Sequence, residues 1–290
     1  MKKLDLTVPQ GVVFGYLGPN GAGKSTTIRM LVGLTRPTAG QVRVLGEDPA
    51  ANPEVRARIG YLPGELRLDD RLTVAQTLTM WARIRRTTDT AYRDQLTERF
   101  ALDPKKPVRG LSTGNRRKLG LVGAFMAKPE LLILDEPTNG LDPLMQQVFL
   151  ATVEEAAADG RTVLLSSHIL SEVERVAGEV AVLRGGQLVA AGPTEEMRRG
   201  AAQRFHAVFI GDMPSAEELR QLAGASEVTV DDRRITVAWS GSPDELLRVL
   251  ARYELESLTA PEPDLEEAFF HHYQTNGTGP GTSSAPLLST

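Results

Sequence analysis

The chain has 290 residues, no cysteine and a formal net charge of −4, which excludes disulfides and thiolate metal sites and gives no overall positive field for nucleic acid. Its 41% hydrophobic residues can fill a packed core, and its length allows one large domain or a large one with a small one. Because the net charge gives no positive field, we expect no nucleic-acid partner. No stretch approaches the ~20 apolar residues that a membrane-spanning helix needs, so we expect the chain to work at a membrane only through another protein.

A phosphate-binding loop is predicted early in the chain. Residues 18–26 fit the pattern G-x-x-x-x-G-K-[ST], after an apolar run at 12–17 that is typical of a buried strand. Apolar residues at helical spacing follow at 28–34. Backbone N–H groups and the helix dipole would then bind phosphate, Lys24 would reach the outer phosphates, and the Ser25 hydroxyl would ligate Mg²⁺. The predicted nucleotide-binding residues are Gly18, Pro19, Asn20, Gly21, Ala22, Gly23, Lys24, Ser25 and Thr26.

Two short strands and a helical region are predicted next. Residues 41–45 alternate like a half-exposed strand, and a strand at 59–62 stops at Pro63-Gly64. Thr73 and Gln76 form a capping box that opens a helix, and we expect Trp81 on the buried face of that helix.

A basic turn opens a further helix. Residues 111–118 read Leu-Ser-Thr-Gly-Asn-Arg-Arg-Lys, and Leu119, Val122 and Met126 should be buried behind them. Three cations at a helix N-terminus oppose its dipole. Either water screens these cations or an anion lies there in the working complex, and the sequence leaves both interpretations open.

Residues 131–136 form an aliphatic strand that ends in two carboxylates. Buried parallel strands commonly carry site residues at their carboxyl ends. Asp135 is placed to hold Mg²⁺ directly or through water, and Glu136 to orient and polarise an attacking water. The residues that follow would also suit an ordinary turn, but the phosphate loop upstream favours the catalytic interpretation.

A third buried strand, at 162–167, ends at His168. This histidine should lie at the same edge of the sheet as Lys24 and Glu136, within reach of a terminal phosphate or of the attacking water. We expect the next helix to start at Ser171, with Glu174 closing a second capping box.

The pattern changes near residue 198. From there, strands and helices alternate in the order strand, helix, two strands, helix, strand, helix, which predicts a small α+β module, ferredoxin-like in its order. We place this module at 199–273. The tail, 274–290, is rich in Gly, Ser, Thr and Pro and should be disordered.

These motifs together resemble the ATP-binding subunit of ABC transporters. Residues 18–26 resemble Walker A, 131–136 Walker B with its catalytic glutamate, 111–115 the family signature, 139–142 the D-loop, and His168 the switch histidine. The resemblance implies an α/β P-loop NTPase fold over 1–198, with a RecA-like parallel-sheet core and a helical subdomain at about 66–127. It implies ATP and Mg²⁺ as cofactors, Glu136, His168 and Lys24 as catalytic residues, and Ser25 and Asp135 as metal ligands.

The family also implies a head-to-tail pair, formed with itself or with a related ATPase. Ser112 and Gly114 of one subunit would face the γ-phosphate held by Lys24 of the other, where a helix N-terminus meets phosphate. ATP would close the pair, and hydrolysis would reopen it and pass the motion to a membrane partner.

The end of the module, residues 262–269, resembles the C-terminal extension of bacterial ABC-2-type exporters, including drug and antibiotic self-resistance pumps. In these exporters the permease is a separate chain. The resemblance implies a cytoplasmic protein that is held on the inner face of the plasma membrane through its permease.

Three features depart from the family pattern. No strand with an adenine-stacking aromatic residue precedes residue 12, so we expect the sheet to lack the usual N-terminal strand. Gly64 and Glu65 stand where a Q-loop glutamine is expected, and Thr113 and Asn115 replace glycine and glutamine of the signature. A nucleotide-dependent dimerising switch with little hydrolysis is therefore the alternative to an exporter ATPase.

Overall fold

The structure, a computed structural model, describes residues 3–87, 89–199 and 202–261. The chain divides into two compact units, Met1–Thr194 and Glu195–Thr290. The division after Thr194 and the predicted limit at residue 198 both lie inside one helix, α8 (Thr194–Arg199). The predicted helix at 264–273 and the tail at 274–290 lie outside the described residues.

A six-stranded sheet forms the core of the first unit. Its order is β2-β3-β4-β1-β5-β6, and all neighbours are parallel except β5 and β6. Because β1 lies beside β4, and β4 beside β3, the carboxyl ends of the three strands predicted to carry the site meet at one edge. The strands are β1 (Val13–Leu17), β2 (Ile59–Leu62), β3 (Leu131–Asp135), β4 (Thr162–Ser167), β5 (Glu179–Arg184) and β6 (Gln187–Pro193).

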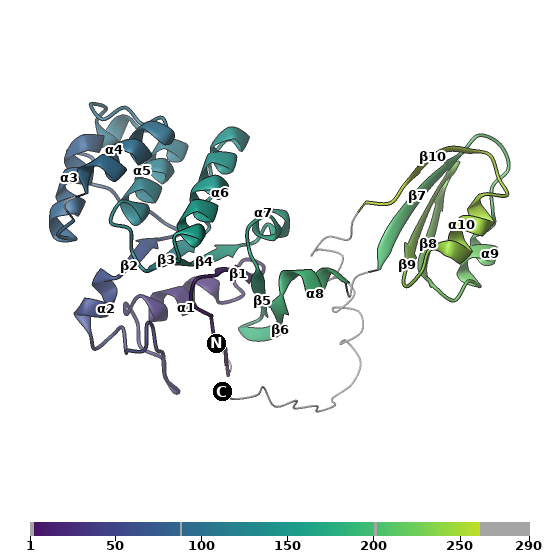
Figure 1. The fold of residues 1–290 in the computed structure, drawn as a ribbon, viewed down its shortest axis with the longest axis horizontal. Coiled ribbons are helices and arrows are strands. Elements are labelled where there is room, and N and C mark those ends of the chain that lie inside the picture. The colour runs from purple at the N-terminus through teal and green to yellow at the C-terminus, as the bar shows by residue number, and fades with distance from the viewer. Residues whose placement is uncertain (1–2, 88, 200–201, 262–290) are drawn as a thin grey trace. The chain divides into compact units, whose positions relative to one another are not determined.

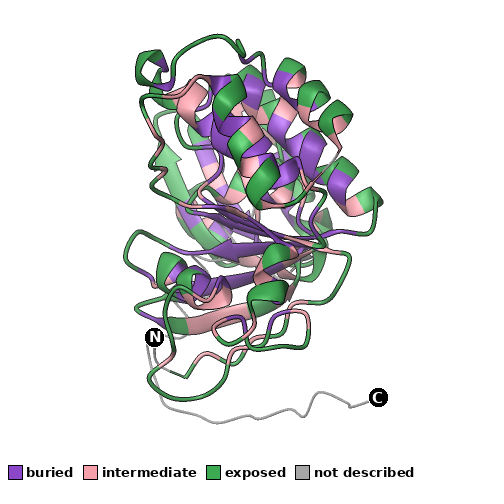
Figure 2. Cartoon of the chain, turned by 90° about the vertical axis from the view of Figure 1, so that its left-hand side faces the viewer, coloured by how far each residue is buried: buried purple, intermediate pink, exposed green. Residues whose placement is uncertain are grey.

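Helices cover both faces of this sheet. Figure 1 shows α3, α4 and α5 grouped together with α6 beside them, and α1 and α2 on the other side of the strands. Figure 2 shows the central strands buried between these layers, which explains why β1, β3 and β4 are apolar on both faces. The helices are α1 (Lys24–Leu31), α2 (Pro53–Ala57), α3 (Val74–Ile84), α4 (Thr90–Arg99), α5 (Thr113–Phe125), α6 (Pro143–Ala158) and α7 (Leu170–Glu174), with a 3₁₀ turn at Val108–Gly110.

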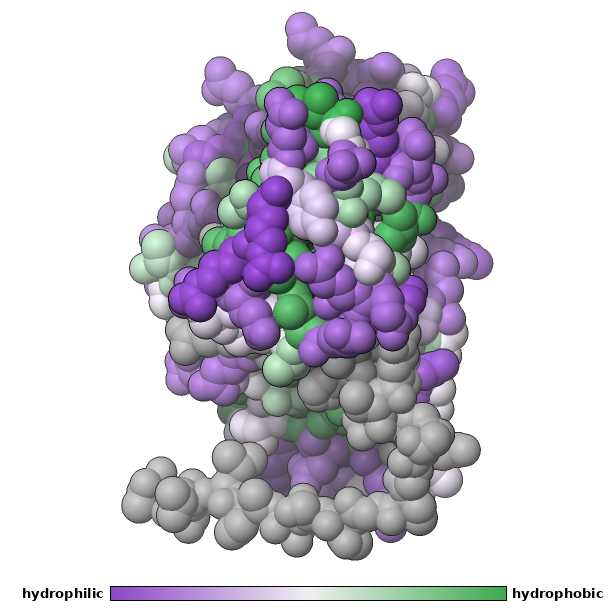
Figure 3. All heavy atoms as spheres, turned by 90° about the vertical axis from the view of Figure 1, so that its right-hand side faces the viewer, coloured by the Kyte–Doolittle hydropathy of each residue, from purple (hydrophilic) through white to green (hydrophobic). Residues whose placement is uncertain are grey.

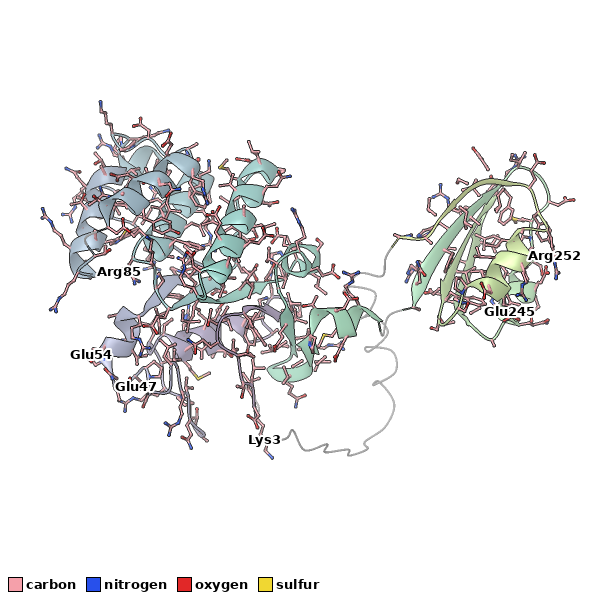
Figure 4. The ribbon with its side chains drawn as sticks, viewed as in Figure 1. Lys3, Glu47, Glu54, Arg85, Glu245 and Arg252 are labelled. Carbon is pink, nitrogen blue, oxygen red and sulfur yellow. The ribbon has the colours of Figure 1, made fainter. Side chains whose placement is uncertain are left out.

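The helical layer is joined to the sheet at β2. The predicted capping box of α3 is present, since Thr73 and Gln76 each bond the other's backbone N–H. Trp81 is half-buried rather than fully enclosed, and its ring lies on α5, where a Cβ at Gly123 would come within 2.5 Å of it. Arg85, labelled in Figure 4, follows α3 and donates a hydrogen bond to the carbonyl of Ile59, 2.9 Å away. As expected, Leu119, Val122 and Met126 are fully buried.

Two local predictions are wrong. Residues 41–45 form only an isolated bridge between Val44 and Glu47, because no strand in the described part of the chain lies beside them. Helix α7 starts at Leu170, and its N-cap, Ile169, has no side-chain hydrogen bond. The predicted capping box from Ser171 to Glu174 is therefore absent.

The described residues before Val13 contain no strand, as expected from the sequence. Leu4, Leu6 and Val8 are nevertheless partly buried and pack against the core of the first unit. Their alternation leaves Asp5 and Thr7 exposed. This segment therefore adds apolar cover to the core without a ladder of hydrogen bonds.

Between residues 202 and 261, the second unit is an antiparallel four-stranded sheet with two helices. Its strand order, β10-β7-β9-β8, and its chain order are those of a ferredoxin-like fold, which confirms that prediction. On the face drawn in Figure 3, hydrophilic residues are interspersed with smaller hydrophobic areas. The elements are β7 (Gln203–Phe209), α9 (Ala216–Arg220), β8 (Ala225–Asp231), β9 (Arg234–Trp239), α10 (Asp244–Leu250) and β10 (Leu255–Thr259).

None of the helices within the described ranges combines the length and the apolar character that would let it span a lipid bilayer.

Candidate active site

The phosphate loop joins β1 to α1 and is shaped by its glycines. Gly18, Gly21 and Gly23 have positive φ angles of 152°, 81° and 105°. A Cβ at Gly18 would lie 2.4 Å from the carbonyl oxygen of Leu183, so only glycine fits there. Gly23 caps α1 without a side-chain hydrogen bond. The first N–H groups of α1 therefore have no side-chain partner at the cap and suit an anion.

Lys24, the first residue of α1, is buried at 6% exposure. Its Nζ donates to the carbonyls of Gly18 and, at 3.4 Å, Pro19, so the side chain lies back over the loop. The same Nζ is 3.2 Å from Oε1 of Glu136, in an ion pair. The structure thus places Lys24 and Glu136 together, although they lie far apart in the sequence.

Asp135 ends β3 with its side chain held by β4. It is 3% exposed, and its Oδ1 accepts a hydrogen bond from Ser166 Oγ at 2.6 Å. The two residues are register partners in the sheet. Oδ2 lies toward Gly64, where an added Cβ would be only 3.1 Å away. Ser166 therefore fixes the Asp135 carboxylate, and the glycine leaves it room.

Glu136 adopts the left-handed conformation, with φ 49°. Its N–H donates to both the carbonyl and the hydroxyl of Ser166, at 3.1 Å each. A non-glycine residue in this region costs free energy, and such residues gather at functional sites. Here the conformation places the Glu136 carboxylate between Lys24 and His168.

His168 follows β4 and contacts the other oxygen of Glu136. Its Nδ1 lies 2.7 Å from Oε2, and the ring is 39% exposed at the side chain. Because a carboxylate only accepts hydrogen bonds, Nδ1 carries the proton in this contact. Oε1 of Glu136 is buried and, despite the nearby Lys24, has no hydrogen-bond donor in the described part of the chain. Oε1 of the glutamate has only the ion pair with Lys24, and the contact of the histidine described here uses only Nδ1, so Oε1 and Nε2 can still bond a substrate.

The sequence interpretation missed two side chains of this edge. Ser166 holds Asp135 and Glu136, yet in the sequence it ends an aliphatic run and reads as an ordinary strand residue. Glu172 accepts a hydrogen bond from Thr138 at 2.6 Å and a longer one from Ser167 at 3.5 Å. It therefore links the turn after β3 to the segment that carries His168. Ser166 could have been found by aligning the ends of the two predicted strands, because it lies opposite Asp135 in the sheet.

In the basic turn at the start of α5, Arg116 and Arg117 bond to other segments of the chain, which the sequence interpretation did not foresee. Arg116 pairs with Asp70 at 2.7 Å, but Arg117 is buried and donates to backbone carbonyls near the site. Ser112 caps α5 by accepting a hydrogen bond from the N–H of Asn115 at 3.3 Å. A Cβ at Gly114 would lie 2.6 Å from the carbonyl oxygen of Gly140, so the signature turn packs closely on the D-loop.

The donor set fits nucleotide-bound Mg²⁺ better than an ion held by protein alone. In the described residues no group of three or more His, Asp or Glu side chains could hold a metal. Mg²⁺ commonly takes one or two protein ligands together with substrate phosphates. A buried carboxylate at Asp135 and a hydroxyl at Ser25, next to an anion-binding loop, provide that combination.

Comparison with known proteins gives the family. Residues 1–139 match the family described as ABC transporter. Daunorubicin resistance ATP-binding protein DrrA3 of Streptomyces coeruleorubidus is 37% identical, over 92% of this chain and 89% of that protein. Nod factor export ATP-binding protein I of Rhizobium leguminosarum bv. viciae is 33% identical, over 92% and 87%.

Solved structures agree with this family. One described as the ATP binding subunit of an ABC transporter is 33% identical, with a TM-score of 0.62 over 67% of this chain and 83% of that one. The dimeric bacterial ABC transporter cassette MJ0796, at 19% identity, shares the fold, with a TM-score of 0.61 over 67% and 90%. The predicted α/β P-loop fold is thereby confirmed, and the chain belongs to the ABC transporter family as one of its ATP-binding proteins.

Proposed function

We propose that this chain hydrolyses ATP with Mg²⁺ at the edge formed by β1, β3 and β4, and so drives an ABC-2-type exporter whose permease is a separate chain. The observation that carries the proposal is the Glu136 carboxylate, which lies between Lys24 Nζ at 3.2 Å and His168 Nδ1 at 2.7 Å. Three separate segments of the chain converge there. The relatives named for daunorubicin resistance and Nod factor export support an exporter.

The residues divide the work by position. The N–H groups of residues 18–26 and Lys24 bind the phosphates, where they neutralise charge that grows in the transition state. Ser25 and Asp135 hold Mg²⁺, which supplies further charge neutralisation. Ser166 keeps the Asp135 carboxylate in one orientation for that role.

Glu136 orients and polarises the attacking water through Oε1, the oxygen without a hydrogen-bond donor in the described residues. His168 holds the other oxygen and thereby fixes the direction of the carboxylate. Its Nε2 then faces the terminal phosphate or the water. Because Nδ1 already carries a proton, donation from Nε2 to phosphate requires the protonated imidazolium.

A pair of such chains, or this chain with a related ATPase, completes two sites. Ser112 and Gly114 lie at the N-terminus of α5, and Gly114 packs against the D-loop carbonyl of Gly140. A helix N-terminus with close backbone approach suits the γ-phosphate bound by the other subunit. ATP binding then closes the pair, and the permease receives the motion.

We infer that the permease binds at the end of α3. Ile84, the last residue of this helix, is 72% exposed, and Met80 on the same helix is also exposed. A shallow groove adjoins them, and its lining includes Tyr61, Leu66 and Trp81. An exposed apolar surface beside a groove suits an amphipathic helix of a partner.

The experiment compares the wild type with Glu136→Gln, each with its permease in membranes. Hydrolysis should fall by about 10³-fold in the variant, because the amide cannot polarise water as a base. Glu154→Gln, which changes an exposed carboxylate on α6, is the matched control and should keep the wild-type rate. Equal rates for the wild type and Glu136→Gln would contradict the proposal.

A nucleotide-dependent dimerising switch remains the second candidate. The observation that favours it is Gly64 in place of a Q-loop glutamine, beside the carboxylate of Asp135. In that case the wild type would bind ATP and dimerise, and neither the wild type nor Glu136→Gln would release phosphate.

A further inference from the structure

Arg117 is a buried cation that bonds the backbone of the catalytic turn. It is 5% exposed, and its guanidinium donates to five backbone carbonyls in two separate segments. Nη1 donates to Pro63 at 2.7 Å and to Gly64 at 3.1 Å, in the turn after β2. Nη2 donates to Asp135 and Glu136, and Nε to Pro137 at 3.3 Å, in the turn after β3.

These contacts make the guanidinium part of the protein interior and not an anion-binding site. Burial lowers the pKa of Arg117 to about 10, while the carboxylates of Asp135 and Glu136 oppose that shift. The side chain is therefore still a cation at neutral pH. Carbonyl dipoles satisfy this charge, and the planar fork of five N–H groups matches the two turns.

The helix that carries Arg117 touches the other parts of the site along its length. At its N-terminus, Gly114 packs against Gly140 of the D-loop. One turn beyond Arg117, Gly120 allows close packing, since a Cβ there would lie 2.7 Å from Leu62 and 2.6 Å from Leu66. Glycine at these two positions lets α5 approach both the D-loop and the end of β2. A displacement of α5 would therefore strain or shift the hydrogen bonds from Arg117 to the backbone carbonyls of the turns after β2 and β3.

We propose that Arg117 is a positioning residue through which the location of α5 sets the geometry of Asp135 and Glu136. The inference rests on the proposed function, because it assigns a role toward the nucleotide-bound metal and the attacking water. Nucleotide contact at Ser112, on the N-terminus of α5, would act on the carboxylates of the same subunit through this side chain. The turn at Pro63 and Gly64 is tied to the same guanidinium and would move with them.

Two substitutions of Arg117 separate the contributions of its side chain. Arg117→Lys keeps the charge, but the three N–H donors of a lysine sit on one nitrogen and cannot serve two turns in a fixed plane. Arg117→Met fills the space and leaves the carbonyls without a donor. Comparison of the two variants with the wild type therefore distinguishes the fork geometry from the charge and from the packing.

The test measures binding of the fluorescent analogue MANT-ATP and hydrolysis of ATP by the full chain over a range of Mg²⁺ concentrations. Arg117 does not touch the phosphate loop in any described contact, so metal-free MANT-ATP binding should stay within about twofold of wild type. In Arg117→Met, the Mg²⁺ concentration that half-saturates ATP hydrolysis should rise by about 10- to 100-fold, and kcat should fall by about the same factor. These are the effects seen for other residues that orient metal ligands. Arg117→Lys should lie between Arg117→Met and the wild type.

Arg116→Met is the matched control, because it changes the preceding residue of the same helix and breaks only an exposed ion pair with Asp70. It should leave both quantities unchanged. If Arg117→Met and Arg116→Met give the same Mg²⁺ dependence and kcat, the inference is overturned while the proposed function stands. If Arg117→Met does not fold, Arg117→Lys carries the test, and wild-type behaviour in that variant overturns the inference. A wild type that neither binds MANT-ATP nor hydrolyses ATP overturns the proposed function itself.

Discussion

The two units contain sheets of six and of four strands, and the two sheets place their polar side chains differently. In the first unit the strands around β1 are parallel, so the residues after β1, β3 and β4 meet at one edge. Lys24 and Asp135 are buried there, and the half-buried Glu136 forms an ion pair with Lys24. In the second unit all neighbours are antiparallel, and successive loops alternate between opposite edges.

Two histidines show the consequence. His168 contacts the carboxylate of Glu136, next to a buried lysine. His206, on β7, lies in a cross-strand pair with Thr236 of β9, with its Nδ1 3.0 Å from the threonine hydroxyl. The first contact involves a carboxylate that also pairs with Lys24, whereas the second joins an imidazole and a hydroxyl across a ladder. Chemistry therefore belongs to the sheet edge of the first unit, and the contrast can be tested.

The largest effect is expected at Lys24. Lys24→Ala removes the cation that lies over the phosphate loop and leaves the Glu136 carboxylate without its ion-pair partner. Hydrolysis should fall by about 10³-fold, which is at the upper end for loss of one positioned donor. MANT-ATP titration measures the loss of nucleotide binding, and phosphate release measures the loss of hydrolysis. Lys105→Ala, at an exposed lysine, is the control and should hydrolyse ATP at the wild-type rate. A wild-type rate in Lys24→Ala would contradict the assignment of the chemistry to the sheet edge of the first unit.

The two histidines give the next comparison. His168→Ala frees Oε2 of Glu136 and should lower kcat by about 10²-fold, because the carboxylate loses its fixed direction. His206→Ala removes only the contact with Thr236 and should leave kcat unchanged. Both variants are measured for phosphate release at saturating ATP. Equal kcat values in the two would show that position at the sheet edge does not matter.

Part of this arrangement could be predicted from the sequence, because local patterns carry it. The apolar runs before Lys24, Asp135 and His168 have the length of buried strands, and the glycine pattern of residues 18–26 defines the loop. Parallel pairing then brings the ends of these runs together. The predicted convergence of Lys24, Asp135, Glu136 and His168 follows from these facts alone.

Other parts depend on contacts that no local pattern records. Arg116 and Arg117 are identical neighbours, yet one is paired at the surface and the other is buried among carbonyls 18 to 54 residues away in the sequence. The alternation at 41–45 predicted a strand, but a strand needs a neighbour, and none lies there in the described residues. The predicted capping box at Ser171 is absent because the helix already begins at Leu170, so Ser171 lies inside its first turn and is not the N-cap.

A smaller effect is expected at Ser166, which supports the edge from the next strand. Ser166→Ala removes the hydrogen bonds to Asp135 Oδ1 and from the N–H of Glu136, while both functional side chains remain. The half-saturating Mg²⁺ concentration for hydrolysis should rise by about tenfold. The matched change in the second unit is Ser226→Ala, where the hydroxyl donates to the carbonyl of Ala238 at 3.1 Å. An unchanged Mg²⁺ dependence in Ser166→Ala would mean that Asp135 is held well enough without it.

The smallest effect on hydrolysis, and the largest on stability, is expected from Phe209→Ala in the second unit. Phe209 is fully buried and stacks edge-on against Tyr253 at 6.1 Å, so truncation should cost that unit about 3–5 kcal/mol. The chain has one tryptophan in each unit, and in a Trp81→Phe background Trp239 reports urea unfolding of the second unit alone. Leu258→Ala, at an exposed position, is the control for stability.

Phosphate release by Phe209→Ala should equal that of the wild type wherever Trp239 still reports a folded second unit, because every residue of the proposed site lies in the first unit. A fall in release before the second unit unfolds would contradict this separation. It would mean that side-chain packing in the second sheet contributes to the geometry at the edge of the first. Hydrolysis would then still occur in the first unit, but residues of the second unit would help to control its rate.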